Sequence, residues 1–276
     1  MTSQSQGVAL ITGASGGMGA VYADRLARRG YDLILVARDG ARLAAVAEAA
    51  RAATGRAVET LRADLSRTDE LAALEARLRT DPAISMLVNN AGVGSAKPLL
   101  EADVEAMSRM IALNVAALMR LTYAAAPAFV ARGGGTIINM ASIVGVAPEI
   151  LNGVYGGTKA FVLALTRSLQ HELGDRGLRV QAVLPGAVGT DFWDLAGTPL
   201  TALPESIVMT PADAVDAALA GLDQGELFTL PALPDIADWD AFEAARLTLM
   251  PNLSRAEPAS RYRIARVPDG RPAADA

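Results

Sequence analysis

Three polar side chains stand at spacings that suit acid–base chemistry at a substrate oxygen. Tyr155 and Lys159 lie four residues apart in a segment of helical periodicity, so both project from one helix face. Ser142 precedes them at the carboxyl end of a predicted strand, where open α/β sheets place their ligand crevice. The three residues therefore predict a site that moves a proton at an oxygen atom.

The expected roles follow from ordinary pKa values. A free phenol titrates near ~10, and a neighbouring ammonium lowers that pKa, so Lys159 is expected to make Tyr155 usable as an acid at neutral pH. Ser142 would hold the substrate oxygen while Tyr155 gives or takes its proton. Taken alone, a Tyr and a Lys at this spacing also fit an exposed helix pair.

The first predicted strand is followed by a glycine-rich turn, Thr12-Gly-Ala-Ser-Gly-Gly-Met-Gly19. Gly13 permits a tight turn, Gly17 lets backbone approach a pyrophosphate, and Gly19 lets helix and strand pack closely. The helix that begins here offers free N–H groups and its positive dipole end to phosphates. The turn predicts dinucleotide binding; the alternative is a tight turn without a ligand.

The end of the second predicted strand reads Ala37-Arg38-Asp39. An NAD-selective fold places an acidic residue at this point to hold the ribose diol. Ala37 cannot bind the diol, whereas Arg38 offers a planar guanidinium for a 2′-phosphate, which favours NADP over NAD. Two alternatives remain: a shift of one residue brings Asp39 to the ribose, or Arg38 is a solvated loop residue.

The composition narrows the chemistry further. The 276 residues contain no Cys and one His, which excludes disulfides, thiolate metal sites and Cys nucleophiles. That residue, His171, is expected on a solvated helix end. Only two of the 25 basic residues are lysines, Lys97 and Lys159, and Lys97 is left without a role.

The net charge of −5 argues against nucleic acid or an anionic membrane surface as the main partner. The uncharged N-terminal stretch is rich in glycine and has no basic region before it, unlike a membrane helix or a secretory signal. We expect a cytoplasmic protein without a metal site.

Apolar runs of four to seven residues alternate with helical patterns along most of the chain. Strands are predicted at 8–12, 32–37, 57–63, 84–89, 136–142, 179–184 and 226–230. Helices are predicted at 18–29, 42–54, 69–80, 103–131, 154–175 and 211–222. This alternation predicts an α/β fold: one doubly wound Rossmann-type domain over 1–250, with a parallel sheet of about seven strands. Residues 251–276 are predicted to form a loosely held C-terminal tail, with contact to a neighbouring subunit as the alternative.

Together these motifs resemble the short-chain dehydrogenase/reductase family from about residue 7 to residue 230. The matching motifs are TGxxxGxG at 12–19, Asn89-Asn90-Ala91-Gly92, Asn114, Ser142, YxxxK at 155–159 and PGxxxT at 185–190. The resemblance implies four catalytic residues: Asn114, Ser142, Tyr155 and Lys159. The cofactor-binding residues that it implies, with those argued above, are Gly13, Ser15, Gly16, Gly17, Met18, Gly19, Arg38, Asp64, Leu65, Asn90, Ala91, Gly92, Tyr155, Lys159, Pro185, Gly186, Val188 and Thr190.

The resemblance also implies individual roles. Asp64 would accept from the adenine amino group, although it also fits a helix cap. Asn114 would open its helix locally and hold a water that links Lys159 to solvent. Lys159 would also bind the nicotinamide ribose, and Thr190 would contact the nicotinamide carboxamide.

Substrate contacts are expected after Ser142 and after Thr190. The predicted substrate-binding residues are Ser142, Val144, Leu151, Tyr155, Phe192 and Trp193. Their apolar character indicates a medium-sized hydrophobic ketone or aldehyde beneath a mobile loop, while the alternative is that the loop residues pack on the body of the protein.

These expectations combine into an NADP(H)-dependent carbonyl reductase or alcohol dehydrogenase. Two alternatives stay open: a dinucleotide-binding sensor or scaffold without turnover, and a family member that performs epimerisation or dehydration. The segments 103–131 and 154–175 carry apolar residues on more than one face. Because family members pair through these helices, a homodimer or homotetramer is expected.

Overall fold

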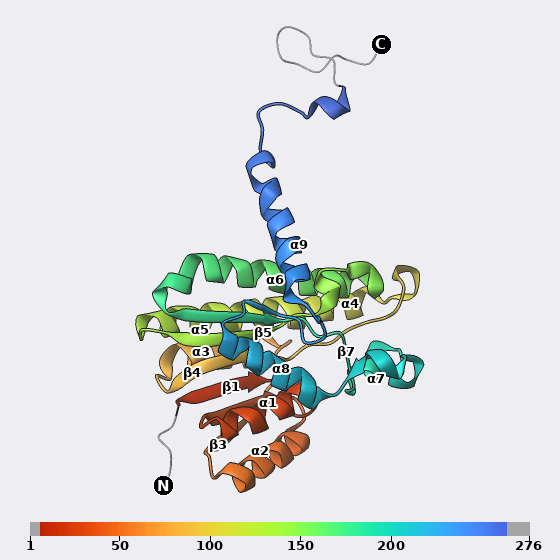
Figure 1. Ribbon diagram of the computed structural model, residues 1–276. Helices are drawn as coiled ribbons and strands as arrows, with labels where there is room; N and C mark the ends of the chain where they lie inside the picture. Colours follow the sequence, from red (N-terminus) through yellow and green to blue (C-terminus); the bar gives the residue numbers. More distant parts are fainter. Residues whose placement is uncertain (1–5, 264–276) are drawn as a thin grey trace. The chain divides into compact units, whose positions relative to one another are not determined.

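The structure is a computed structural model that describes residues 6–263. Its internal contacts divide the chain into two units, Met1–Ala232 and Leu233–Ala276. The first unit contains the predicted sheet and all the predicted site residues (Figure 1).

A seven-stranded sheet forms the centre of the first unit, in the order β3-β2-β1-β4-β5-β6-β9. All its pairings are parallel. The strands are β1 (Val8–Thr12), β2 (Asp32–Ala37), β3 (Val58–Arg62), β4 (Ile84–Asn89), β5 (Gly135–Met140), β6 (Leu178–Val183) and β9 (Phe228–Thr229). The predicted doubly wound fold is confirmed, and so is the number of strands.

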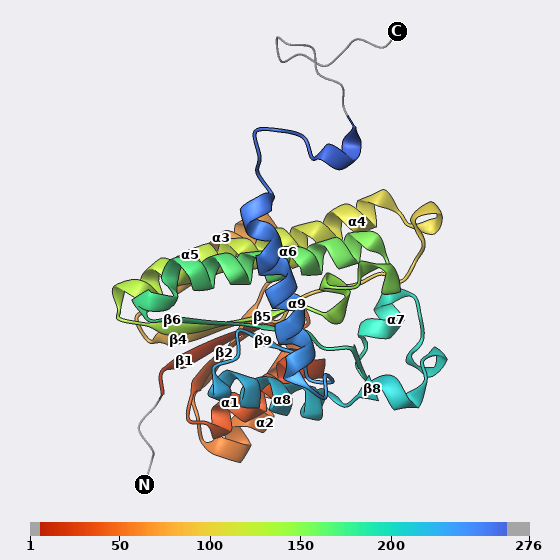
Figure 2. The ribbon, with the colours of Figure 1, turned by 45° about the horizontal axis from the view of Figure 1, so that its top comes forward.

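Helices cover both faces of this sheet, as Figure 2 shows. They are α1 (Gly17–Arg28), α2 (Gly40–Thr54), α3 (Thr68–Thr80), α4 (Val104–Ile111), α5 (Leu118–Ala131), α6 (Gly153–Leu173) and α8 (Pro211–Gln224). Apolar residues of α1, α2 and α8 form one core, and those of α3, α5 and α6 form the other. Alternate residues of β1 serve the two cores: Ala9 and Ile11 face one, and Leu10 the other. Burial on both faces explains why the strands have no polar alternation.

The predicted helix over 103–131 is interrupted in its middle. A π-helical stretch, η2 (Ala112–Ala117), separates α4 from α5. By length and composition Val104–Ala131 could cross a membrane, but half of its most apolar window is buried inside the protein. Leu121, Ala125 and Phe129 belong to the core that α3, α5 and α6 form against the sheet, as expected for a core helix.

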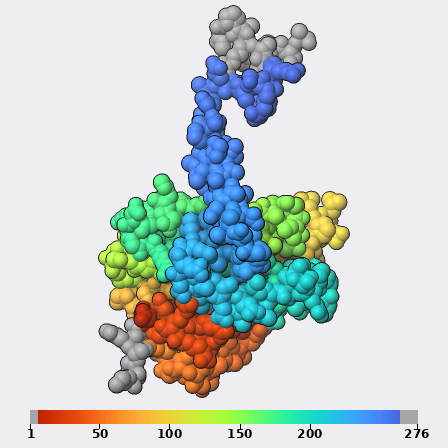
Figure 3. Space-filling view, viewed as in Figure 1, coloured from red at the N-terminus to blue at the C-terminus, as the bar shows by residue number. Residues whose placement is uncertain are grey.

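The segment between β6 and α8 holds elements that the sequence pattern did not predict. Two short strands, β7 (Ala187–Val188) and β8 (Val208–Met209), pair in parallel and bracket the short helix α7 (Phe192–Ala196). Figure 3 shows this segment, in teal, as part of the surface of the first unit. The strand pair ties both ends of the loop that was expected to cover the substrate.

The second unit contains a helix that was not predicted, α9 (Ile236–Leu249). Its Trp239 and Phe242 rings lie 5.2 Å apart. The division at residue 232 does not coincide with the domain boundary predicted at residue 250, which stays a prediction. The last part of the predicted tail, 264–276, lies outside the described residues.

Candidate active site

Helix α6 positions Tyr155 and Lys159 on one buried face. Asn152 caps the helix, because its Oδ1 accepts from the backbone N–H of Val154 at 2.9 Å and of Tyr155 at 3.4 Å. The Tyr155 and Lys159 side chains then enter one cavity of about 280 Å³ together with Ser142. The structure therefore brings together the three residues that the sequence singled out.

Ser142 follows the end of β5 and begins the 3₁₀ turn η3 (Ile143–Gly145). Its hydroxyl donates to the Pro185 carbonyl at 3.3 Å and accepts from the Val144 N–H at 3.4 Å. The Tyr155 phenol lies in the same cavity, where Ser142 acts to lower its pKa. These contacts hold the serine hydroxyl and the phenol at one point of the cavity.

Burial controls the pKa values of this group. It raises the pKa of Tyr155 to about 12, although the hydrogen bond with Ser142 acts in the opposite direction. Burial also lowers the pKa of Lys159 to about 8. The expected lowering of the Tyr155 pKa by Lys159 is therefore wrong for this arrangement, in which desolvation of the phenol dominates.

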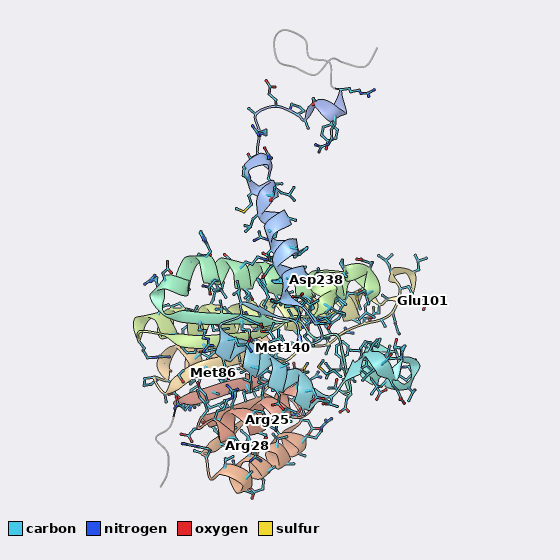
Figure 4. The ribbon with its side chains drawn as sticks, in the orientation of Figure 1. Arg25, Arg28, Met86, Glu101, Met140 and Asp238 are labelled. Atoms are coloured by element: carbon cyan, nitrogen blue, oxygen red, sulfur yellow. The ribbon has the colours of Figure 1, made fainter. Side chains whose placement is uncertain are left out.

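The position of Lys159 explains part of this result. Its Nζ donates to the Met140 carbonyl at 2.7 Å and lies 5.8 Å from the centre of the Tyr155 ring. Met140, labelled in Figure 4, ends β5, which lies between β4 and β6 in the sheet. The ammonium is thus anchored to the strand end.

Asn114 lies in the π-helical stretch and is buried behind the cavity. Its Nδ2 donates to the Val93 carbonyl at 2.8 Å and to Thr158 Oγ1 at 3.2 Å, and its Oδ1 accepts from the Val93 N–H at 3.0 Å. A Cβ at Gly92 would lie 3.2 Å from Asn114 Oδ1 and 3.7 Å from Lys159 Nζ. The local opening of the helix is present as expected; the water-relay role stays a prediction.

The glycine-rich turn joins β1 to α1 and is fixed by Thr12 and Asn90. Thr12 Oγ1 accepts from the N–H groups of Asn90 and Ala91, each at 3.0 Å. Asn90 Nδ2 donates to the carbonyls of Thr12 and Gly13 at 2.9 and 3.1 Å. Thr12 is a positioning residue that the site prediction left out, although it opens the motif.

The glycines of this turn are required by space and conformation. Gly13 and Gly17 have φ of 67° and 53°, in the left-handed region. A Cβ at Gly19 would lie 2.2 Å from the Gly13 carbonyl oxygen, so Gly19 serves close packing and does not line the groove described next. The N-cap of α1, Gly16, supplies no side-chain cap, which leaves this helix end suited to an anion.

A groove of about 660 Å³ runs from this turn along the carboxyl ends of the strands. It is lined by most of the predicted cofactor residues: Gly13, Ser15, Gly16, Gly17, Met18, Arg38, Asp64, Leu65, Asn90, Ala91, Gly92 and Thr190. Pro185, Gly186 and Val188 line the cavity of Tyr155 instead. Met18, Asn90, Gly92, Thr190 and Phe192 line both spaces, so groove and cavity are adjacent. These residues fit a dinucleotide whose reactive end reaches Tyr155.

The groove end near β2 bears on the choice of nucleotide. The Asp39 carboxylate caps α2, because its Oδ1 accepts from the Arg42 N–H at 3.0 Å; Asp39 also lines the groove. Arg38 is exposed and faces the groove. Asp64 accepts from the N–H and hydroxyl of Ser66 at 3.0 and 2.7 Å; partial burial raises its pKa, but these bonds lower it overall. Asp64 therefore shapes a turn at the groove wall.

The predicted substrate residues Val144, Leu151, Phe192 and Trp193 line the cavity. Phe192 lies 5.7 Å from Tyr155, centroid to centroid, and Trp193 Nε1 donates to the Val188 carbonyl at 2.9 Å. Leu195, by contrast, is 73% exposed and faces the groove.

Sequence reasoning missed several residues here. Ile150 and Ile207 also line the cavity. Gly94 makes room for Phe192, since a Cβ there would lie 2.2 Å from Phe192 Cζ. Arg42 reaches the groove from α2. Arg42 lies in the first turn of the helix that follows Arg38, and that position was a signal for the last of these.

Comparisons with known proteins agree with this geometry. Residues 7–198 match the family model described as short chain dehydrogenase. A short-chain dehydrogenase from Sphingobium yanoikuyae, solved in complex with NADPH, is 50% identical with a TM-score of 0.89; the match covers 93% of this chain and 100% of that one. A bulky-bulky ketone specific alcohol dehydrogenase from Comamonas testosteroni is 42% identical with a TM-score of 0.86, covering 94% and 99%. An uncharacterized oxidoreductase of Staphylococcus saprophyticus is 34% identical over 218 residues, 79% of this chain and 91% of its own. The chain thus belongs to the short-chain dehydrogenase/reductase family of oxidoreductases.

Proposed function

We propose that this protein is an NADP(H)-dependent oxidoreductase that transfers a hydride between the nicotinamide and a carbonyl or secondary alcohol. The observation that carries the proposal is the convergence of Ser142, Tyr155 and Lys159 in a cavity that adjoins the glycine-lined groove. The cofactor supplies the hydride when bound. The chain itself supplies orientation, exclusion of water and the proton.

The residues divide this work between them. Ser142 donates a hydrogen bond to the substrate oxygen, and Tyr155 delivers the proton to that oxygen as negative charge develops on it. With a pKa near 12, Tyr155 is protonated at neutral pH, which suits reduction of a carbonyl. Lys159 places a positive charge at the base of the site, and Asn114 holds the backbone around it.

Preference for NADP rests on Arg38, which faces the groove, and on the use of one Asp39 carboxylate oxygen to cap α2. The S. yanoikuyae relative, which is complexed with NADPH, supports the same preference. Arg38 would bind the 2′-phosphate by charge-assisted hydrogen bonds.

The substrate class is a medium-sized apolar ketone or aldehyde. Beyond the catalytic side chains, the cavity is lined mainly by apolar residues of the 143–151 segment and of the 187–207 segment. The C. testosteroni relative, named for bulky ketones, supports this class.

The test is a panel of ketones and aldehydes with NADPH consumption as the signal. Turnover is expected with bulky apolar ketones, and Tyr155→Phe should abolish it while NADPH binding is retained. Tyr262→Phe, at an exposed tyrosine of the second unit, is the matched control. NADPH binding without turnover on any carbonyl would favour the sensor or the epimerase alternative, and full activity of Tyr155→Phe would refute the mechanism.

We further propose that the protein is cytoplasmic and assembles as a homodimer or homotetramer through α5 and α6. These helices form a largely apolar hollow of about 340 Å³, lined by residues such as Tyr123, Ala126, Leu165 and Leu169. Tyr123 is 67% exposed in the single chain. Light scattering should give a multiple of the chain mass. Tyr123→Arg, at an exposed residue of the hollow, should shift that mass toward the monomer.

A further inference from the structure

One ion pair joins the two walls of the nucleotide groove. Arg42, in the first turn of α2, places Nη2 2.8 Å from Asp191 Oδ2, and Asp191 directly precedes α7. Both side chains line the groove. The pair therefore connects the helix beside the predicted 2′-phosphate site to the segment that covers the substrate cavity.

Neighbouring residues hold this pair against the phosphate turn. The Arg42 N–H is fixed by the Asp39 cap, and its guanidinium lies over Gly16, where a Cβ would be 2.4 Å from Nη2. On the other wall, Thr190 lies against Gly17, where a Cβ would be 3.1 Å from the Thr190 methyl group. The glycines thus let both walls approach the turn.

The same wall continues into the substrate site. Asp191 is followed by Phe192 and Trp193, and the Phe192 ring packs near Tyr155. A change in the position of Asp191 therefore moves the residues that enclose the substrate cavity.

We propose that Arg42 and Asp191 form a clasp across the groove, which slows dinucleotide release and holds α7 against the substrate cavity. Both act as positioning residues. The proposal rests on the proposed function in taking NADPH as the ligand of the groove. The groove has a volume of about 660 Å³ with the pair formed.

The size of the effect follows from exposure. The Arg42 and Asp191 side chains are 54% and 68% exposed, so the pair is a solvent-screened one. Such pairs change an equilibrium or a rate by about two- to fivefold.

The first experiment measures NADPH dissociation by stopped-flow fluorescence for Arg42→Gln, Asp191→Asn and the double variant. Each single variant should release NADPH about two- to fivefold faster, and the double variant should be no faster than Arg42→Gln. The direction of the change in the NADPH dissociation rate for Asp191→Asn is decisive. If Asp191 only repelled the phosphates, removing its charge would slow release. Arg29→Gln breaks a comparable exposed pair with Asp223 at 2.9 Å and should change nothing.

The second experiment needs no nucleotide. In a Trp239→Phe background, Trp193 is the one remaining tryptophan and reports on α7 through acrylamide quenching. Arg42→Gln and Asp191→Asn should raise its quenching equally, and Arg29→Gln should not.

The outcomes separate the two proposals. Slower release in Asp191→Asn, additive effects in the double variant, or unchanged Trp193 quenching would overturn the clasp while leaving the proposed function intact. A wild-type protein that fails to bind NADPH would overturn both.

Discussion

The nucleotide groove and the substrate cavity adjoin, yet they are built in different ways. The groove is shaped by backbone: its turn depends on Gly13, Gly17 and Gly19. The side chains of Thr12 and Asn90 fix that turn through hydrogen bonds to main-chain groups. The cavity is shaped by side chains from separate segments, among them Val144, Leu151 and Phe192. A site built from backbone cannot accommodate an added Cβ at its glycines. A cavity lined by side chains can change its volume while the catalytic residues stay in place.

The largest effect is expected from a substitution in the backbone-shaped groove. Gly19→Ala places a Cβ 2.2 Å from the Gly13 carbonyl, so the phosphate turn must move. NADPH affinity should fall about 10- to 100-fold, measured by fluorescence titration. Gly157→Ala on α6 is the control, because its Cβ meets nothing within 4 Å. Equal effects of the two substitutions would show that the turn tolerates a side chain.

Arg38→Asp tests the selectivity of the same groove. Losing charge-assisted bonds to a 2′-phosphate should weaken NADPH binding about 10-fold or more, while NADH binding improves or stays constant. Titration with both nucleotides gives the ratio. An unchanged affinity for NADPH would remove Arg38 from the site.

The pH dependence of carbonyl reduction tests the role of the Lys159 charge in the cavity. The pKa of Lys159 is lowered to about 8, so its positive charge is present below that pH and is lost above it. Tyr155, with a pKa of about 12, keeps its proton throughout this range. We expect kcat/KM to be level below pH 8 and to fall about tenfold per unit above it. Lys159→Gln should remove this break, and a break that persists in that variant must come from another group.

The smallest expected effect concerns the side-chain wall. Phe192→Ala should reduce kcat/KM for a small ketone about fivefold while sparing a bulky one, because the ring contacts small substrates and limits large ones. A ketone series of increasing size measures this ratio. Leu195→Ala, at an exposed residue outside the cavity, should leave the ratio unchanged.

Local sequence patterns predicted most of the fold and the reactive residues. Each strand of β1 to β6 was predicted to within about two residues, because strands buried on both faces are apolar throughout. The short elements α7 and β7 were missed, since five- and two-residue elements have too few positions to show periodicity. Helix α9 was missed because the composition after the sheet gave only a weak apolar pattern.

What the sequence determined by itself is the type of chemistry. The spacing of Tyr155 and Lys159 and the glycines of the phosphate turn act within one helical turn or one loop, where neighbours in the chain are neighbours in space. Tertiary structure decided the rest. The direction of the Tyr155 pKa shift depends on how deeply the fold buries the phenol. The Arg42–Asp191 pair joins residues 149 positions apart, and only the folded chain brings them together.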